Sequence, residues 1–198
     1  MSNSDIANSE NDRKPPSRRW PGGIFGRFAK ADRGTAAIEF GFVAIPFFTL
    51  LFAILETALV FLNQAMLDSG LNEAARLVRT GQAQFSGLDE AGFRQAVCDN
   101  SWAMIDCGGT LYVDVRAFPN FNDINVPDPI DADGEITGGF GFNGGIEGDV
   151  VVARVFYNMT LFSPTAWGIG LGNLATGDRL LSSAATFRNE PFGGALGP

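Results

Sequence analysis

The chain has 198 residues and no histidine, and its charges are divided unevenly along its length. The lack of histidine excludes Ser-His-Asp and Cys-His nucleophilic sites and every zinc site built on histidine. Residues 13–34 hold seven basic residues and one acidic residue, whereas the chain after Leu62 holds sixteen acidic residues and seven arginines. This acidic main part argues against nucleic acid as a partner.

The first segment is a basic leader, residues 1–34. Its first 23 residues are polar and include three prolines. Such a segment buries too little apolar surface to offset its conformational entropy, so we expect residues 1–23 to be disordered.

An apolar segment follows from Thr35 to Leu62, and its only charged residues are Glu39 and Glu56. As a helix it would reach about 40 Å, enough to cross a bilayer. A buried core helix of a soluble protein would need a polar face, and a cleaved secretory signal would be shorter. Because basic residues precede the span, the positive-inside rule predicts a cytoplasmic N-terminus and an external C-terminal part. Pro46 removes a backbone donor and can kink or locally melt this helix, but proline is also common in membrane helices that stay regular.

The remaining chain predicts an α+β domain. Apolar residues at helical spacing continue to a glycine cap, Gly81, which extends the membrane helix over 35–81. Residues 82–198 then form the extracytoplasmic domain, with a second helix over Leu88–Ile105. Alternating apolar residues predict three strands: Leu111–Phe118, Val150–Phe162 and Arg179–Phe187. Helices followed by strands favour a small antiparallel sheet packed on the helix.

The junction between leader and span carries the most specific signal, RGTAAIEF at residues 33–40. Counting Thr35 as position one, Glu39 occupies position five. This junction resembles the class III, or type IV pilin, signal. The resemblance implies that a prepilin peptidase cuts between Gly34 and Thr35 on the cytoplasmic side and that the helix stays with the mature protein.

The charge of Glu39 needs a reason, since a carboxylate costs about 2–3 kcal/mol at the centre of a membrane helix and less near its edge. In pilin-like filaments Glu at this position pairs with the new α-amino group of its own or a neighbouring subunit. The alternative is that Glu39 lies at the interface and reaches water.

The likeness extends over roughly residues 33–192. Five features in this order carry it: RGTAAIEFGFVAIPFFTLLFAILE, AARLVRTGQ, the two cysteines, VFYNMTLFSP and LLSSAATFRNEPF. Together they resemble the TadE-type pseudopilins of tight-adherence (Flp/Tad) pilus systems. The resemblance implies a minor pilin needed to assemble an adhesive fibre, with no catalytic activity and no cofactor. Its partners would be the prepilin peptidase, other pilin subunits, the pilus assembly platform and the inner membrane. Position one is Thr35 rather than Phe, which leaves N-methylation open, and the long leader leaves a later start codon open.

A different function remains as an alternative. The chain would then be an unprocessed, signal-anchored membrane protein whose periplasmic domain binds a ligand or a surface. Processing at Gly34 distinguishes the two.

The cysteine pair and the second acidic residue of the span also carry expectations. Cys98 and Cys107 are expected to form a disulfide in an oxidising periplasm, because metal ligation would need two more ligands and no histidine is present. Glu56 is expected either at the outer membrane interface or in contact with a partner membrane helix.

Two glycine- and acid-rich motifs point weakly to ligands. Gly139, Gly141 and Gly144 spell a G-x-G-x-x-G, but a strand rather than a helix follows, so a dinucleotide site is not expected. The loop Asp123–Asp149 matches a calcium loop only in its middle positions, so a solvated loop is favoured over a calcium site.

Overall fold

The computed structural model describes residues 32–101, 105–162 and 170–192, with side chains from residue 36 onward. The chain divides into two compact units, residues 1–48 and 49–198. Helix α2, Asp32–Arg79, contributes to both units. The disorder expected for residues 1–23, and almost all of the leader, lie outside the described residues.

The long predicted helix is confirmed. Helix α2 has 48 residues and is continuous through Pro46, so no melted turn interrupts it there. It ends where expected, because Gly81 adopts the left-handed conformation with φ 80°. A side chain at Gly81 would also collide with the Phe192 ring, whose nearest atom lies 2.5 Å from the position of a Cβ. Position 81 therefore requires glycine for two independent reasons, its left-handed conformation and the closeness of Phe192.

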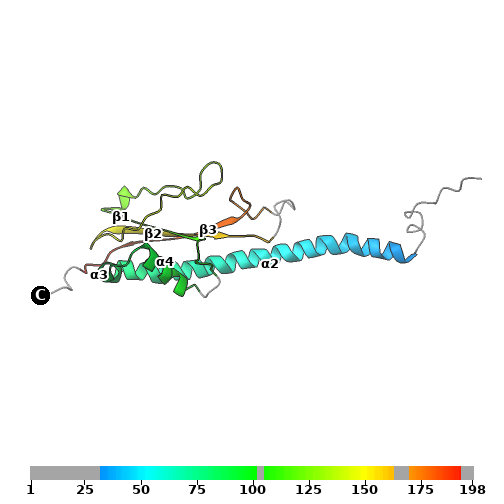
Figure 1. Cartoon of the computed structure of the whole chain (residues 1–198), viewed down its shortest axis with the longest axis horizontal. Helices are drawn as coiled ribbons and strands as arrows, with labels where there is room; N and C mark the ends of the chain where they lie inside the picture. Colours follow the sequence, from blue (N-terminus) through cyan, green and yellow to red (C-terminus); the bar gives the residue numbers. More distant parts are fainter. Residues whose placement is uncertain (1–31, 102–104, 163–169, 193–198) are drawn as a thin grey trace, which may run out of the picture. The chain divides into compact units, whose positions relative to one another are not determined.

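The domain that follows is α+β, as predicted, and Figure 1 shows its sheet beside the second half of α2. The elements after α2 are α3 (Gln82–Ser86), α4 (Glu90–Asp99), β1 (Leu111–Phe118), the 3₁₀ helix η1 (Phe121–Asp123), β2 (Val150–Met159) and β3 (Arg179–Arg188). The three strands form one antiparallel sheet in the order β1-β2-β3.

The predicted second helix is shorter than expected, ending at Asp99 instead of continuing to Ile105. Two polar side chains explain the end: Asn100 donates to the Ala96 carbonyl at 2.9 Å and Ser101 donates to the Val97 carbonyl at 2.5 Å. Side chains that bond the backbone locally compete with helix continuation. Strand β2 likewise ends at Met159, three residues before the predicted end.

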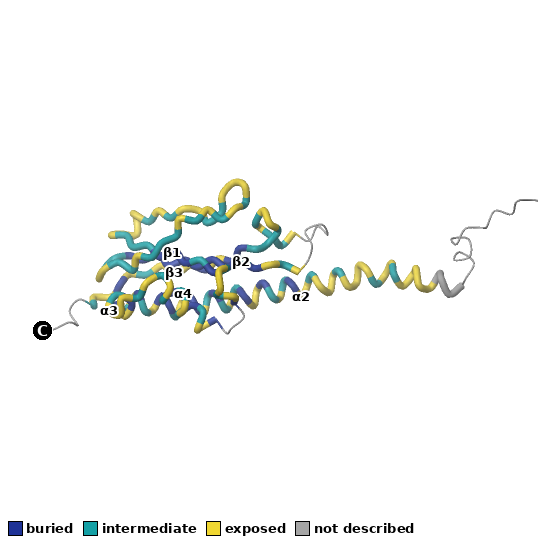
Figure 2. The backbone as a smooth tube through the Cα atoms, viewed as in Figure 1, coloured by how far each residue is buried: buried dark blue, intermediate teal, exposed yellow. Residues whose placement is uncertain are grey.

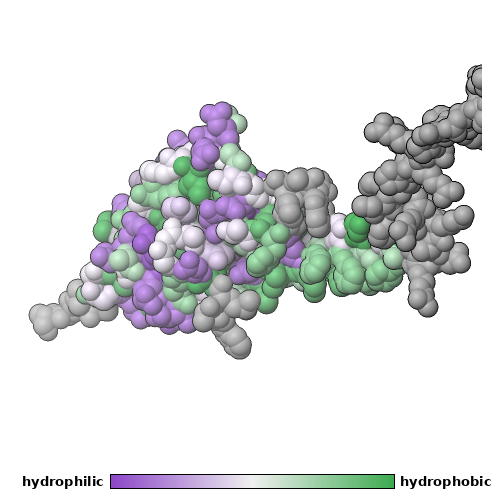
Figure 3. Space-filling view, turned by 45° about the vertical axis from the view of Figure 1, so that its right-hand side comes forward, coloured by the Kyte–Doolittle hydropathy of each residue, from purple (hydrophilic) through white to green (hydrophobic). Residues whose placement is uncertain are grey.

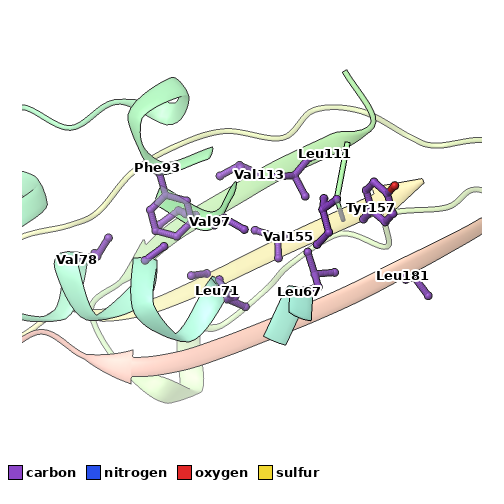
Figure 4. Close-up of a cluster of buried hydrophobic side chains, with 14 of the residues drawn as sticks. Leu67, Leu71, Val78, Phe93, Val97, Leu111, Val113, Val155, Tyr157 and Leu181 are labelled. Carbon is purple, nitrogen blue, oxygen red and sulfur yellow. The ribbon is translucent and has the colours of Figure 1, made fainter. Parts of the chain in front are cut away.

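The apolar core lies between the sheet and the helices. Odd-numbered residues of β1, β2 and β3 point toward α2 and α4, as the alternation of side chains in a strand requires. Figure 4 shows the facing side chains converging, among them Leu67, Leu71 and Val78 of α2 and Phe93 and Val97 of α4. In Figure 2 the buried residues follow β2 and one side of α2. This packing is what gives the second half of α2 a buried stripe.

Gly70 allows α4 to approach α2 closely. A Cβ at Gly70 would stand 2.6 Å from the Val97 carbonyl oxygen and 2.3 Å from the Ser101 hydroxyl oxygen. Neither distance is compatible with a real side chain, and one of the two atoms belongs to the backbone. The fold therefore requires glycine at this point of α2.

The opposite face of the sheet is polar at its centre and is covered by the long segment between β1 and β2. Asp114 is completely buried there and accepts hydrogen bonds from Arg154 and Arg116. The same arginines bind the covering segment: Arg154 donates to the Pro127 carbonyl and Arg116 to the Gly139 carbonyl. The ion cluster thus fastens the loop to the sheet.

The two outer edges of the sheet differ. The edge of β1 is paired, because Val115 donates to the Gly141 carbonyl at 2.7 Å and accepts from the Asn143 N–H at 2.8 Å. The beginning of the β3 edge is capped by a side chain, because Asn173 bonds both the N–H and the C=O of Leu180.

Further along β3 the edge is open. Residues of even number turn their backbone groups outward, as the caps on Leu180 and the bond from Gln64 to the Ser182 carbonyl show. Ala184 and Thr186 therefore turn an N–H and a C=O outward, and no described residue bonds these four groups. The C-terminal half of β3 is an unprotected edge.

Candidate processing and membrane site

The first part of α2 presents apolar side chains outward. Twelve large hydrophobic residues between positions 38 and 55 are exposed: Ile38, Phe40, Phe42, Val43, Ile45, Phe47, Phe48, Leu50, Leu51, Phe52, Ile54 and Leu55. Figure 3 colours the visible part of this helix hydrophobic, whereas the sheet-bearing domain has a mixed surface. A soluble helix would place its apolar residues on one face only. Apolar side chains on all sides of α2 are typical of a helix surrounded by lipid.

Among the described residues one helix, Ala36–Arg79, is long and apolar enough to cross a membrane. No charged residue lies between Phe40 and Leu55, and from Val60 onward one side of the helix is buried in the core. The structure is thus consistent with single-pass membrane anchoring.

The expected processing site lies at the beginning of α2. Gly34 and Thr35 fall within the first residues of the helix, which starts at Asp32. Glu39 follows one turn after Thr35, and its side chain is exposed. Residues four apart lie on the same helix face, so the Glu39 carboxylate and the main chain at Thr35 share one face of α2.

Glu56 has a position that the sequence did not indicate. Its side chain is 3% exposed, and its Oε1 accepts a hydrogen bond from the Phe162 backbone N–H at 2.5 Å. The two alternatives weighed from the sequence, outer interface or partner helix, did not include this contact within the chain. No local signal predicts it, because 106 residues separate the partners.

The predicted disulfide is confirmed. Cys98 of α4 and Cys107, just before β1, are bonded with their Cα atoms 6.3 Å apart. The bridge ties the end of α4 to the entry of the sheet. The chain has no other cysteine.

The described residues show no metal-binding geometry. They contain no group of three or more acidic, Cys or His side chains that could hold a metal ion. In the acidic loop, Asp131 Oδ1 accepts the backbone N–H groups of Asp133 and Glu135, so this carboxylate organises a turn. Gly139 and Gly141 lie in the segment covering the sheet, and a strand follows them, unlike a dinucleotide-binding turn.

These features define a class: a protein with one candidate membrane helix that continues into the core of a small disulfide-bonded α+β domain. The family model of TadE-like proteins matches residues 34–76, which begin at the expected processing site and include most of α2. The resemblance inferred from the junction and the span is therefore confirmed over these residues. Comparison with curated proteins and with solved structures gave no match.

Proposed function

We propose that the chain is a minor pilin of the TadE type: a structural subunit, not an enzyme, that a prepilin peptidase processes and that a tight-adherence pilus system needs for fibre assembly. The observation that carries the proposal is the TadE-like match over residues 34–76, beginning at Gly34. Such a subunit acts by contact through its surface and its membrane helix. Its partners are other pilin subunits and the assembly platform.

The architecture supports this proposal in two ways. The helix that would remain after cleavage is continuous from the junction to residues of the core, so no separate linker segment lies between them. The charge pattern favours a cytoplasmic leader and a domain outside the inner membrane, where the disulfide would persist.

Processing is the decisive test. Intact-mass measurement of the membrane-extracted protein should give a chain beginning at Thr35 in cells with the prepilin peptidase and the full-length chain in cells without it. Gly34→Leu, which places a bulky side chain at the cleavage position, should remain full-length in both. A full-length wild-type chain in cells with an active peptidase would contradict the proposal and favour the unprocessed, signal-anchored alternative.

A further inference from the structure

Phe162 is the most exposed large hydrophobic side chain among the described residues, at 81%. It does not belong to α2 but to the turn after β2, in the unit of residues 49–198. Its neighbours Thr160 and Leu161 are uncharged. An isolated exposed Phe is ordinary, so its significance depends on where the chain holds it.

The main chain of Phe162 is held beside one residue of α2. Its N–H donates to the Glu56 carboxylate, which is itself buried. On the other side, Met159 at the end of β2 is paired with Arg179 of β3. Only two residues separate Met159 from Phe162, so both ends of the turn are fixed.

The bond to Glu56 determines where along the membrane helix Phe162 lies. The lipid-facing part of α2, residues 36–55, carries one charge, Glu39, near its inner end. Its twenty residues rise about 30 Å, the thickness of the hydrocarbon core. Glu56 is the next residue, so its bond places the Phe162 main chain where the hydrocarbon ends.

We propose that Phe162 enters the bilayer at the outer boundary of the hydrocarbon, so that the turn after β2 forms a second membrane contact beside the span. This inference rests on the membrane span of the proposed function. The partner is a lipid surface because the main chain of Phe162 is bonded to the residue that directly follows the lipid-facing segment, and because residues 160–162 are uncharged. The contact is therefore hydrophobic and does not require anionic lipid. Glu56 then has a structural role: it satisfies the backbone N–H of a residue that water reaches poorly.

Photo-crosslinking of the full chain tests this contact. Benzoylphenylalanine replaces Phe162 in one variant, Phe52 in a second and Phe121 in a third, and each is reconstituted in phosphatidylcholine vesicles and irradiated. Phe52 is exposed within the span, whereas Phe121 is exposed in η1. Phe118, which precedes η1, pairs with Val150 at the beginning of β2, whereas Met159 is at the other end of that strand. Phe121 therefore serves as a control far from the turn after β2. We expect lipid adducts, detected by peptide mass, at positions 52 and 162. We expect none at position 121.

The other outcomes separate the second membrane contact from the membrane span. Lipid adducts at position 52 without any at position 162 would refute the second membrane contact and leave the span intact. A protein adduct at position 162 would show that Phe162 contacts a neighbouring subunit and not lipid, and would refute the proposal. No lipid adduct at position 52 would refute the span itself and with it the proposed function. In the Phe162 variant, adding Glu56→Ala should reduce the adducts at 162, whereas the same change should leave those at 52 unaltered.

Discussion

Asp114 and Arg154 face each other across β1 and β2 and form a buried ion pair. Asp114 Oδ2 accepts from Arg154 Nε at 3.1 Å and from Nη2 at 2.5 Å, while its Oδ1 accepts from Arg116 at 2.8 Å. Burial alone would raise the pKa of the Asp114 carboxyl, but the hydrogen bonds and charges of the two arginines outweigh burial and lower it. The carboxylate therefore stabilises the fold as an anion.

Asp114→Asn should destabilise the domain by about 3 kcal/mol, because it leaves the guanidinium of Arg154 buried without its counterion. Chemical denaturation of the detergent-solubilised chain, followed by near-ultraviolet circular dichroism, measures the loss. Glu73→Gln is the matched control, since the Glu73–Arg76 pair is exposed and should contribute little. Equal stability of the two variants would contradict the role of the buried pair.

The same pair predicts a pH dependence. Since the folded-state pKa of Asp114 lies below its ordinary value of 3.8, its contribution is fully present above that value and is lost as the pH falls through the lower, folded-state pKa. The stability difference between wild type and Asp114→Asn should therefore be constant near neutral pH and shrink in acid. A difference that grows on acidification would show that the shift has the opposite sign.

Gly70→Ala should destabilise the protein by about 1–3 kcal/mol, because its Cβ would collide with the Val97 carbonyl. Alanine favours a helix over glycine by about 1 kcal/mol, so a net loss can come only from the collision. Gly92→Ala in α4 is the control: its Cβ would meet mainly the flexible end of Leu88. Both unfolding midpoints can be compared by denaturation, and a stabilised Gly70→Ala would exclude the close helix contact.

Removing the disulfide with the double variant Cys98→Ala, Cys107→Ala should cost about 2–3 kcal/mol, since the bond closes a short loop in the unfolded chain. The loss is read from the denaturation midpoint under oxidising conditions. Under a strong reductant the wild type should approach the variant. A wild type indifferent to reductant would mean that the bond adds nothing to stability.

Glu39→Gln should impair assembly while leaving insertion and processing intact. The change removes the charge but keeps the size of the side chain, and an uncharged helix inserts more easily. Surface pili, or co-purification of other pilin subunits, should fall sharply at native expression, while the intact mass still reports a chain beginning at Thr35. Glu39→Asp, which keeps the charge with a shorter reach, should fall between. Normal piliation in Glu39→Gln cells would return Glu39 to the interfacial alternative.

Much of this architecture could be predicted because its signals are local. The apolar run before Glu56, the glycine at position 81 and the alternation in β1 each depend on neighbouring residues, and each prediction was confirmed. The predicted ends of the second helix and of the second strand were wrong, because the polar residues after Asp99 and the turn after Met159 compete with regular structure.

The unpredicted features are contacts between distant residues. The bond from Phe162 to Glu56 and the ion pair of Asp114 with Arg154 connect residues 106 and 40 positions apart. A sequence shows that such residues are charged, but only the sheet register and the packing on α2 decide which of them meet. The same holds for Gly70, whose spacing looks like that of any helical glycine until α4 is placed against it.

The open edge of β3 has a consequence for how copies of the chain can meet. The contacts of Gln64 with Ser182 and of Glu190 with Arg79 show that β3 runs in the same direction as α2. Two such edges joined antiparallel would point their helices in opposite directions. Copies inserted alike in one bilayer cannot do this, so membrane insertion would itself prevent antiparallel pairing at Ala184 and Thr186. Protein extracted into detergent loses that protection, and its tendency to dimerise through the β3 edges should rise with concentration.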